Sequence, residues 1–302
     1  MVSVIIPNFN HSLYLEQRIY SVLNQTYQNF EIIFLDDFSN DNSREIIESY
    51  RNNVKVTHIS YNDKNSDSPF CQWHKGISLS KGDYIWIAES DDVSDLFFLE
   101  KIIKNISSSE NLVLSYCATI NIDDKDSVIG ENNWASELDP ILWKNDFITK
   151  SKNKVYSYLS FRNIIPNASA VVFRKSSISD FDFNKINQLK YAGDWLFWIH
   201  VFSKGGIAFS SDFLNFQRHH TFSTTSKKSL SNEIIRIKEY LSCIKYYHSL
   251  TNSSTSFFNN RYDWLFDQIR TNIPFNLKTI VALSGFSKSI SFLFRLLISY
   301  FK

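Results

Sequence analysis

Three carboxylates lie within the four residues Glu89-Ser90-Asp91-Asp92. Like charges this close repel one another, so the cluster needs a cation or hydrogen-bond donors beside it. Carboxylate oxygens suit Mg²⁺ or Mn²⁺, which proteins often hold through one or two carboxylates together with substrate phosphates. The alternative is a solvated turn in which Asp95 caps the next helix. The apolar run at 84–88 favours the metal site, because it would fix the cluster at the edge of a sheet.

A second acidic cluster, Asp36-Asp37, follows another apolar run and is close to Asp41. A carboxylate at this place could accept hydrogen bonds from a uracil imide or from a ribose hydroxyl. Helix capping explains the same residues equally well, since Asp, Asn and Ser are the common N-cap types.

Two further positions could carry chemistry. Asp194 opens a strongly apolar helical segment, where a carboxylate is stabilised by the helix dipole. The sharper alternative is a general base held against aromatic rings. Arg218-His219-His220 could clamp a phosphate through the arginine and ligate a metal through a histidine. A polar surface segment is the simpler interpretation of this tripeptide.

The segments that carry these residues alternate between two patterns over the first hundred positions. Leu15, Ile19 and Val22 mark one face of a helix, and continuous apolar runs of strand length come before and after it. Strands buried on both faces, with helices between them, predict an α/β fold with a parallel sheet. The predicted strands are 2–6, 30–35, 54–59 and 84–88. Ligands bind beyond the carboxyl ends of such strands, so both acidic clusters should border one crevice.

The rest of the chain is less regular. Ile234, Ile237, Leu241 and Ile244 form the stripe of an amphipathic helix. Further expected elements are helices at 96–106 and 194–202, strands at 112–118 and 168–173, and a polar, loop-rich stretch at 125–154. We expect a catalytic domain at 1–225, with a nucleotide-binding half at 1–110 and an acceptor half at 111–225, followed by a helical C-terminal extension at 226–302.

Composition excludes some classes of protein. The net charge of +1 gives no reason to expect nucleic acid as a partner. Three widely spaced cysteines fit neither a disulfide framework nor a paired metal site, and they suit a reducing compartment. The first residues lack the basic start of a signal peptide, and no apolar run reaches the length of a membrane span. We therefore expect a cytoplasmic protein.

The last residues, 276–302, combine a wide apolar face with a narrow basic stripe that includes Lys288, Arg295 and Lys302. This pattern is typical of a helix that lies in a membrane interface. It predicts peripheral contact with the inner face of the membrane. Packing on the catalytic domain or on another subunit of a homo-oligomer is the alternative.

Taken in order, these pieces resemble the family-two glycosyltransferases, which have the GT-A fold. The opening VSVIIPNFN at 2–10 is similar to the first strand of that family, and 21–39 is similar to its second-strand signature. The segment 75–92 resembles the one that delivers the metal-binding Asp-x-Asp motif. NASAVVFR at 167–174, Gly193-Asp194-Trp195 and Arg218-His219-His220 follow in the family's order. The resemblance covers roughly residues 1–225.

The resemblance implies an inverting transfer of a sugar from a nucleotide-diphosphate sugar, UDP-linked by expectation, to a hydroxyl of a glycan or lipid-linked acceptor in cell-surface polysaccharide synthesis. It implies that Asp194 is the catalytic base, and that Glu89, Asp91 and His220 hold Mn²⁺ or Mg²⁺. The implied donor-binding residues are Pro7, Asn8, Asp36, Asp37, Lys75, Ser90 and Arg218.

Two departures and two rivals qualify the resemblance. Glu89 stands where the family has the first acid of Asp-x-Asp, and Trp73-His74 replaces its common Arg-Asn, which leaves Lys75 for a phosphate contact. A nucleotidyltransferase on a similar sheet is one rival, but 7–11 contains no glycine for a phosphate loop. A non-catalytic carbohydrate-binding protein that kept the fold is the other.

Overall fold

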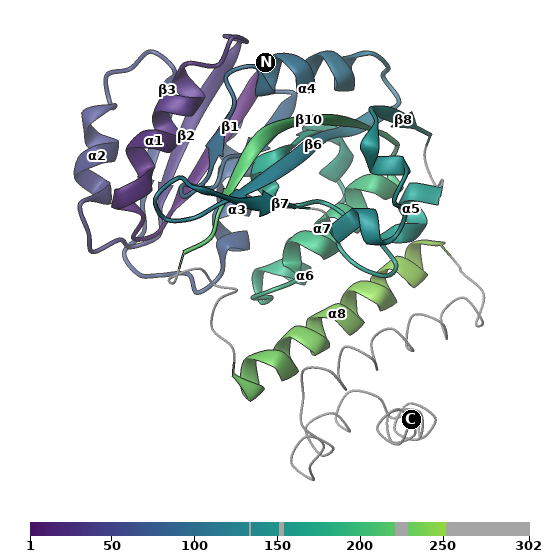
Figure 1. Cartoon of the computed structure of the whole chain (residues 1–302). Helices are drawn as coiled ribbons and strands as arrows, with labels where there is room; N and C mark the ends of the chain where they lie inside the picture. The colour runs from purple at the N-terminus through teal and green to yellow at the C-terminus, as the bar shows by residue number, and fades with distance from the viewer. Residues whose placement is uncertain (133, 151–153, 221–228, 252–302) are drawn as a thin grey trace.

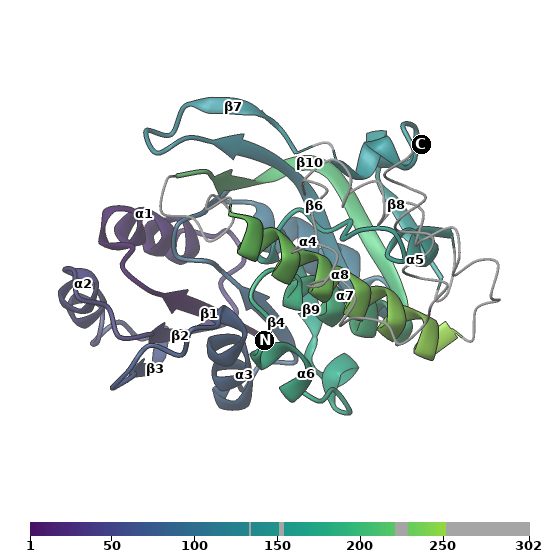
Figure 2. The same cartoon turned by 90° about the horizontal axis from the view of Figure 1, so that it is seen from below.

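The computed structural model describes residues 1–132, 134–150, 154–220 and 229–251. In this part of the chain, ten strands form one sheet in the order β3-β2-β1-β4-β9-β6-β10-β5, with β7 beside β6 and β8 beside β10. Helices cover both faces of the sheet (Figures 1 and 2).

The first four strands of this order are parallel, as the continuous apolar runs predict. They are β1 (Val2–Asn8), β2 (Phe30–Asp36), β3 (Val56–Tyr61) and β4 (Tyr84–Ile87). β1 lies between β2 and β4, and its last residue, Asn8, is opposite Asp36 of β2. The connecting helices are α1 (Ser12–Leu23), α2 (Ser43–Ser49) and α3 (Pro69–Leu79). The carboxyl ends of these strands therefore meet at one edge.

The second half makes the sheet mixed. β9 (Val171–Arg174) lies antiparallel between β4 and β6 (Leu112–Ile122), and β10 (Gly206–Arg218) continues the sheet parallel to β6. β5 (Val93–Ser94) pairs with the end of β10. The region 125–154 was expected to be loop-rich, yet it contains β7 (Val128–Glu131) and β8 (Phe147–Thr149), which lie at the margins of the sheet.

Two hydrophobic cores lie on the two faces of the sheet. One core includes α1 and α4 (Phe98–Ser107). The other includes α3, α7 (Gly193–Ser203) and α8 (Leu230–Thr251). It contains many of the buried aromatic side chains, including Trp73, Phe197 and Trp198. Ile237, Leu241 and Ile244 of α8 are buried there, as their spacing predicts. The remaining elements are α5 (Lys154–Tyr158), α6 (Asn184–Asn187) and 3₁₀ turns at Trp134–Glu137, Leu142–Lys144, Ala168–Ala170 and Lys175–Ile178.

Two expectations fall on other parts of the chain. The boundary between 225 and 226 and the basic apolar segment 276–302 lie outside the described residues. Among the residues that are described, no helix combines the length and the apolar character that crossing a membrane needs. All three cysteines are free, in agreement with the expected absence of a disulfide framework.

Candidate active site

The site lies at the carboxyl ends of β1, β2 and β4, where the sequence predicts it. The loop after β1 touches both acidic clusters. Asn8 Nδ2 donates to Asp36 Oδ2 at 3.1 Å, and His11 Nδ1 is 2.8 Å from Ser90 Oγ. The two clusters therefore border a common edge, with the β1 loop between them.

In the acidic cluster at 89–92, Asp91 is the carboxylate that meets histidines. Its Oδ2 is 3.1 Å from His220 Nε2, and one ligand atom each from His11, Asp91 and His220 lies within 4.8 Å of the others. Two ligands at right angles around an ion with bonds of about 2.1 Å lie roughly 3 Å apart, so this donor set fits a divalent cation. Burial pushes the pKa of Asp91 up, but the neighbouring His11 and His220 outweigh it, and the net pKa is lowered.

Glu89 lies outside this group of three, although it was expected to be a ligand. Its Oε1 accepts a hydrogen bond from Trp73 Nε1 at 3.0 Å. Burial and the nearby charge of Asp91 raise the pKa of Glu89 to about 8. Trp73 stands where the family has arginine, so a neutral donor faces this carboxyl. A ligand role for Glu89 remains a prediction.

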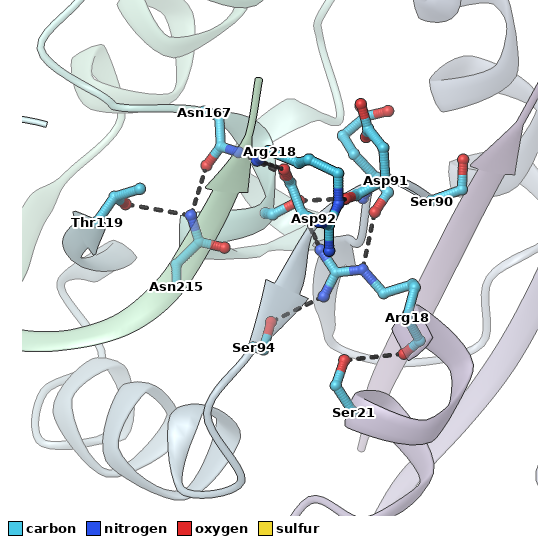
Figure 3. A network of polar contacts seen from close by, with 12 residues as sticks. Arg18, Ser21, Ser90, Asp91, Asp92, Ser94, Thr119, Asn167, Asn215 and Arg218 are labelled. Atoms are coloured by element: carbon cyan, nitrogen blue, oxygen red, sulfur yellow. Dashed lines mark hydrogen bonds and ion pairs between the residues drawn. The ribbon is translucent and has the colours of Figure 1, made fainter. Parts of the chain in front are cut away.

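Asp92, the next residue along, is buried and bonded to other groups of the protein (Figure 3). Its Oδ1 accepts from the backbone N–H of Arg218 at 3.0 Å, and its Oδ2 accepts from Asn167 Nδ2 at 2.5 Å. The fully buried guanidinium of Arg18 lies 4.0 Å away. Burial and the charge of Asp91 raise the pKa of Asp92.

Arg18 is a buried cation next to the loop 89–92, which carries Asp91 and Asp92 (Figure 3). Its Nε donates to the carbonyl oxygen of Glu89, and its Nη1 and Nη2 donate to the hydroxyls of Ser94 and Ser169, each at 2.8 Å. A buried charge is tolerable when its donors are satisfied and a counter-ion is near. Arg18 therefore fixes the backbone that carries Asp91.

Arg218, expected to contact the donor, is also buried and bound to protein groups. Its Nε donates to the carbonyl oxygen of Asp91, its Nη1 to that of Asp123, and its Nη2 to Gln17 Oε1 and Asp126 Oδ1. These contacts hold the end of β10, and with it His220, against the Asp91 loop. A phosphate contact by Arg218 stays a prediction.

The acidic cluster at 36–37 is equally well connected. Asp36 is fully buried and accepts from Arg44 Nε at 2.9 Å as well as from Asn8. Asp37 accepts from Asn62 Nδ2, from the backbone N–H and hydroxyl of Ser66, and from Gln72 Nε2. Asp37 thus closes the loop that leads into α3.

The other expected donor-binding residues surround this cluster. Pro7 is buried in β1 beside Leu35, and Lys75 Nζ donates to Asn62 Oδ1 at 2.7 Å. Asn8 Oδ1 and Gln72 Oε1 are buried acceptors without a partner among the described residues. Buried polar atoms are normally paired, so two open acceptors at this edge suit a ligand that brings donors.

Asp194 lies at the start of α7. A Cβ on the preceding Gly193 would lie 2.4 Å from the ring of Phe70, so only glycine lets this helix start pack on α3. The carboxylate accepts from Asn163 Nδ2 at 2.8 Å and from the backbone N–H of Trp195 at 2.7 Å. Burial nevertheless raises the pKa of Asp194 to about 6. A half-buried carboxylate with this pKa can accept a proton near neutral pH.

Two residues of the site, His11 and Arg18, were not predicted, although each has a signal in the sequence. His11 comes three residues after the first strand, at the edge where the acidic clusters lie. Arg18 is spaced with Leu15, Ile19 and Val22 on the buried face of α1, and a cation on an apolar face needs an internal partner.

Comparisons with known proteins agree with this geometry. The sequence model of glycosyl transferase family 2 matches residues 3–177, more than half of the chain. An uncharacterised glycosyltransferase of Haemophilus influenzae is 27% identical over 235 residues, which are 75% of this chain and 68% of that protein. The glycosyltransferase GlyG of Streptococcus pneumoniae is 35% identical over 113 residues, and the match spans 36% of each protein.

Solved structures show the same fold. The crystal structure of S. aureus TarS in complex with UDP-GlcNAc superposes with a TM-score of 0.67 at 18% identity, covering 94% of this chain and 80% of that one. The expected GT-A fold is thereby confirmed, and the family match confirms the resemblance seen in the motifs. The chain belongs to glycosyl transferase family 2.

Proposed function

We propose that this chain is an inverting glycosyltransferase that moves a sugar from a UDP-linked donor to a hydroxyl of a glycan or lipid-linked acceptor in cell-surface polysaccharide synthesis. One observation carries the proposal: in a chain of this family, Asp91 and His220 converge to 3.1 Å at the carboxyl end of β4. The UDP-GlcNAc bound by TarS, which shares the fold, supports the choice of nucleotide.

Asp91, His220 and His11 would hold the metal ion of such an enzyme. A bound divalent ion supplies Lewis acidity, which stabilises the departing nucleoside diphosphate. Two imidazoles beside one carboxylate favour Mn²⁺ over Mg²⁺, because nitrogen donors suit transition metals better. Arg18 and Arg218 keep the loop of Asp91 in place through its backbone carbonyls.

Asp194 would take the proton from the acceptor hydroxyl as that oxygen attacks the anomeric carbon. A single displacement inverts the configuration and needs no second carboxylate as a nucleophile. The raised pKa of Asp194 supports this role. Near neutral pH the group is largely ionised, yet it remains basic enough to accept a proton.

The donor's nucleoside would lie over the acidic cluster at 36–37, near Asn8. The open acceptors Asn8 Oδ1 and Gln72 Oε1 support a contact with an imide or a hydroxyl there. Lys75 reaches the same place through Asn62 and would approach a phosphate.

The test is the metal-dependent binding of UDP by the Asp91→Asn variant, measured as a thermal shift with and without Mn²⁺. Wild-type protein should gain melting temperature from UDP and Mn²⁺ together, and a folded Asp91→Asn variant should not. Asp83→Asn is the matched control, because Asp83 is exposed and pairs with the N-terminus at the opposite end of β1. If the Asp91→Asn variant keeps an unchanged Mn²⁺-dependent affinity for UDP, the proposal is wrong.

The rival functions have no specific observation in their favour. A nucleotidyltransferase and a non-catalytic carbohydrate-binding protein are both excluded if purified protein hydrolyses or transfers sugar from a UDP-sugar in a Mn²⁺-dependent way. Loss of that turnover in Asp194→Asn would assign it to the site described above.

For its place in the cell, we propose the cytoplasm, with contact to the inner face of the membrane through 276–302. This rests on the basic and apolar pattern of that segment. Full-length protein should co-sediment with anionic vesicles at low salt, and protein without 276–302 should not. A full-length protein that stays in the supernatant contradicts the membrane contact and leaves self-association of that segment as the alternative.

A further inference from the structure

One face of α8 packs on the short loop that leads into α7 (Figures 1 and 2). Four side chains with the spacing of a single helical face, Arg236, Glu239, Tyr240 and Cys243, contact residues 190–195. α7 begins directly after this loop, and Asp194 is the second residue of that helix. The family match ends at residue 177, so both partners of this contact lie beyond the matched segment.

Glu239 makes the central contact. Its Oε1 accepts from the backbone N–H of Lys190 at 2.8 Å, and its Oε2 accepts from those of Tyr191 and Ala192 at 2.7 and 2.8 Å. Glu239 is only 5% exposed, and no ion pair to it is found in the part of the chain that the structure describes. Three consecutive peptide groups therefore stabilise this buried carboxylate.

The neighbours of Glu239 on α8 extend the contact. Cys243 Sγ donates to the carbonyl oxygen of Ala192 at 3.4 Å, and the guanidinium of Arg236 lies 4.9 Å from the ring centre of Tyr191. The rings of Tyr240 and Trp195 meet edge to face at 5.5 Å. Every residue from 190 to 192, and Trp195 beyond them, is thus held by α8.

We propose that Glu239 is a positioning residue for Asp194: it fixes the loop that aims the base, and its negative charge helps to keep the base proton-accepting near neutral pH. The inference rests on the proposed role of Asp194 as the base. A buried carboxylate on three peptide N–H groups sets the backbone direction just where α7 begins, and a 1 Å error in the position of a reacting group can cost about 100-fold in rate.

Charge is the second part of the proposal. Burial is the largest cause of the raised pKa of Asp194, and the like charge of Glu239 adds to it, while Asn163 and the N–H of Trp195 act in the opposite direction. The other titratable groups of α8 that face Asp194 are Tyr240 and Cys243, and the pKa of each is raised, so both are neutral. Removal of the Glu239 charge should therefore lower the pKa of Asp194.

Glu239→Gln and Glu239→Asp separate geometry from charge. The amide of glutamine cannot accept from all three N–H groups, so kcat should fall about 10- to 100-fold while the KM for the donor stays near its wild-type value. The acid limb of kcat/KM should move to lower pH by roughly 0.5–1 unit, because a like charge has gone. Glu239→Asp is too short for the same contacts but keeps the charge, so kcat should fall while the acid limb stays in place.

Glu31→Gln is the matched control. Glu31 is a buried glutamate that also accepts three contacts, from the hydroxyls of Ser3 and Thr57 and from the N–H of Lys81, at the opposite end of β1 and β2. Its replacement should lower the melting temperature as Glu239→Gln does, but it should leave both the acid limb and kcat unchanged.

Amide hydrogen exchange supplies a readout that does not depend on catalysis. Exchange at Lys190, Tyr191 and Ala192 should rise in Glu239→Gln and not in Glu31→Gln. Faster exchange with an unmoved acid limb and normal kcat would overturn the positioning role, as would equal kinetic effects of the two variants. If Asp194→Asn itself turns over normally, the proposed function fails instead, whatever Glu239→Gln does to exchange.

Discussion

Two aspartates of this chain, Asp91 after β4 and Asp194 at the start of α7, have opposite surroundings. Asp91 faces the imidazoles of His11 and His220, and the buried guanidinium of Arg18 lies behind its loop. Among the described residues, Asp194 accepts hydrogen bonds from neutral donors, Asn163 and a backbone N–H, and α8 brings a second carboxylate near it. In the described part of the chain, basic side chains therefore surround Asp91, whereas neutral donors contact Asp194.

This difference assigns different chemistry to one residue type. Both carboxyl groups lose solvent, which by itself raises the pKa of each. Histidines outweigh that effect at Asp91 and keep it ionised, as a metal ligand must be. At Asp194 burial wins, and the pKa rises to about 6, as a base working near neutral pH requires.

The largest expected effect comes from removing the base. Asp194→Asn should lower turnover by a factor of about 10²–10⁴, the usual scale of general base catalysis, and should leave the donor affinity unchanged. Steady-state kinetics and UDP binding by calorimetry measure the two quantities. Asp182→Asn, at an exposed position before α6, is the control. Near-normal turnover in a folded Asp194→Asn variant would return this residue to a structural role at the start of α7.

The next largest effect concerns Arg18, the buried cation behind the loop of Asp91. Arg18→Met keeps much of the side-chain volume but leaves Asp92 buried without its nearest cation, so the free energy of unfolding should fall by about 3–5 kcal/mol. Urea denaturation at pH 7 measures it. Arg51→Met removes an exposed ion pair with Glu48 and should change stability little. Equal stability of the two variants would mean that Arg18 does not compensate the buried charge of Asp92.

The sequence predicts the first half of the fold well, and the physical reason is local. Continuous apolar runs of this length, such as 2–6 and 30–35, favour strands buried on both faces, and the helices between them imply parallel neighbours. The antiparallel insertion of β9 between β4 and β6 depends on contacts distant in sequence, which no periodicity records. β7 and β8 were missed because short strands at a sheet margin carry little apolar pattern.

For the site, the sequence places acidic residues at strand ends but does not say which carboxylate meets which partner. The family resemblance predicts Asp91 and His220 at one metal site, and the structure brings their side chains to 3.1 Å. Glu89 was expected beside them, yet it faces Trp73, because the side chain that occupies that space is set by the packing of α3. Glu239 meets the N–H groups of 190–192 across almost fifty residues of chain, and no sequence pattern reveals that contact.

A smaller effect tests whether His11 belongs to the metal site around Asp91. His11→Ala should weaken Mn²⁺ binding in the presence of UDP by roughly 10- to 100-fold, the scale reported for groups that support a metal site. Mn²⁺ titration followed by electron paramagnetic resonance measures it. His219→Ala is the control, because His219 is exposed and bonds to Asn121 instead of the Asp91 group. Equal Mn²⁺ affinity in the two variants would remove His11 from the ligand set.

The smallest expected effect tests the neutral donor beside Asp194. The direction in which the pKa of Asp194 moves is the informative result. Asn163 Nδ2 donates to the Asp194 carboxylate, a bond that favours the ionised form and lowers the pKa. Asn163→Ala removes it, so the pKa of Asp194 should rise and the acid limb of kcat/KM should move from about pH 6 to higher pH, by roughly 0.5–1 unit. Below that limb kcat/KM falls about tenfold per pH unit, so the variant should lose about three- to tenfold at pH 5 and little at pH 8. Asn132→Ala, which removes a bond to Gln217 away from Asp194, should leave the limb in place. A shift to lower pH in Asn163→Ala, the direction expected for Glu239→Gln, would mean that neutral donors do not set the charge state of this base.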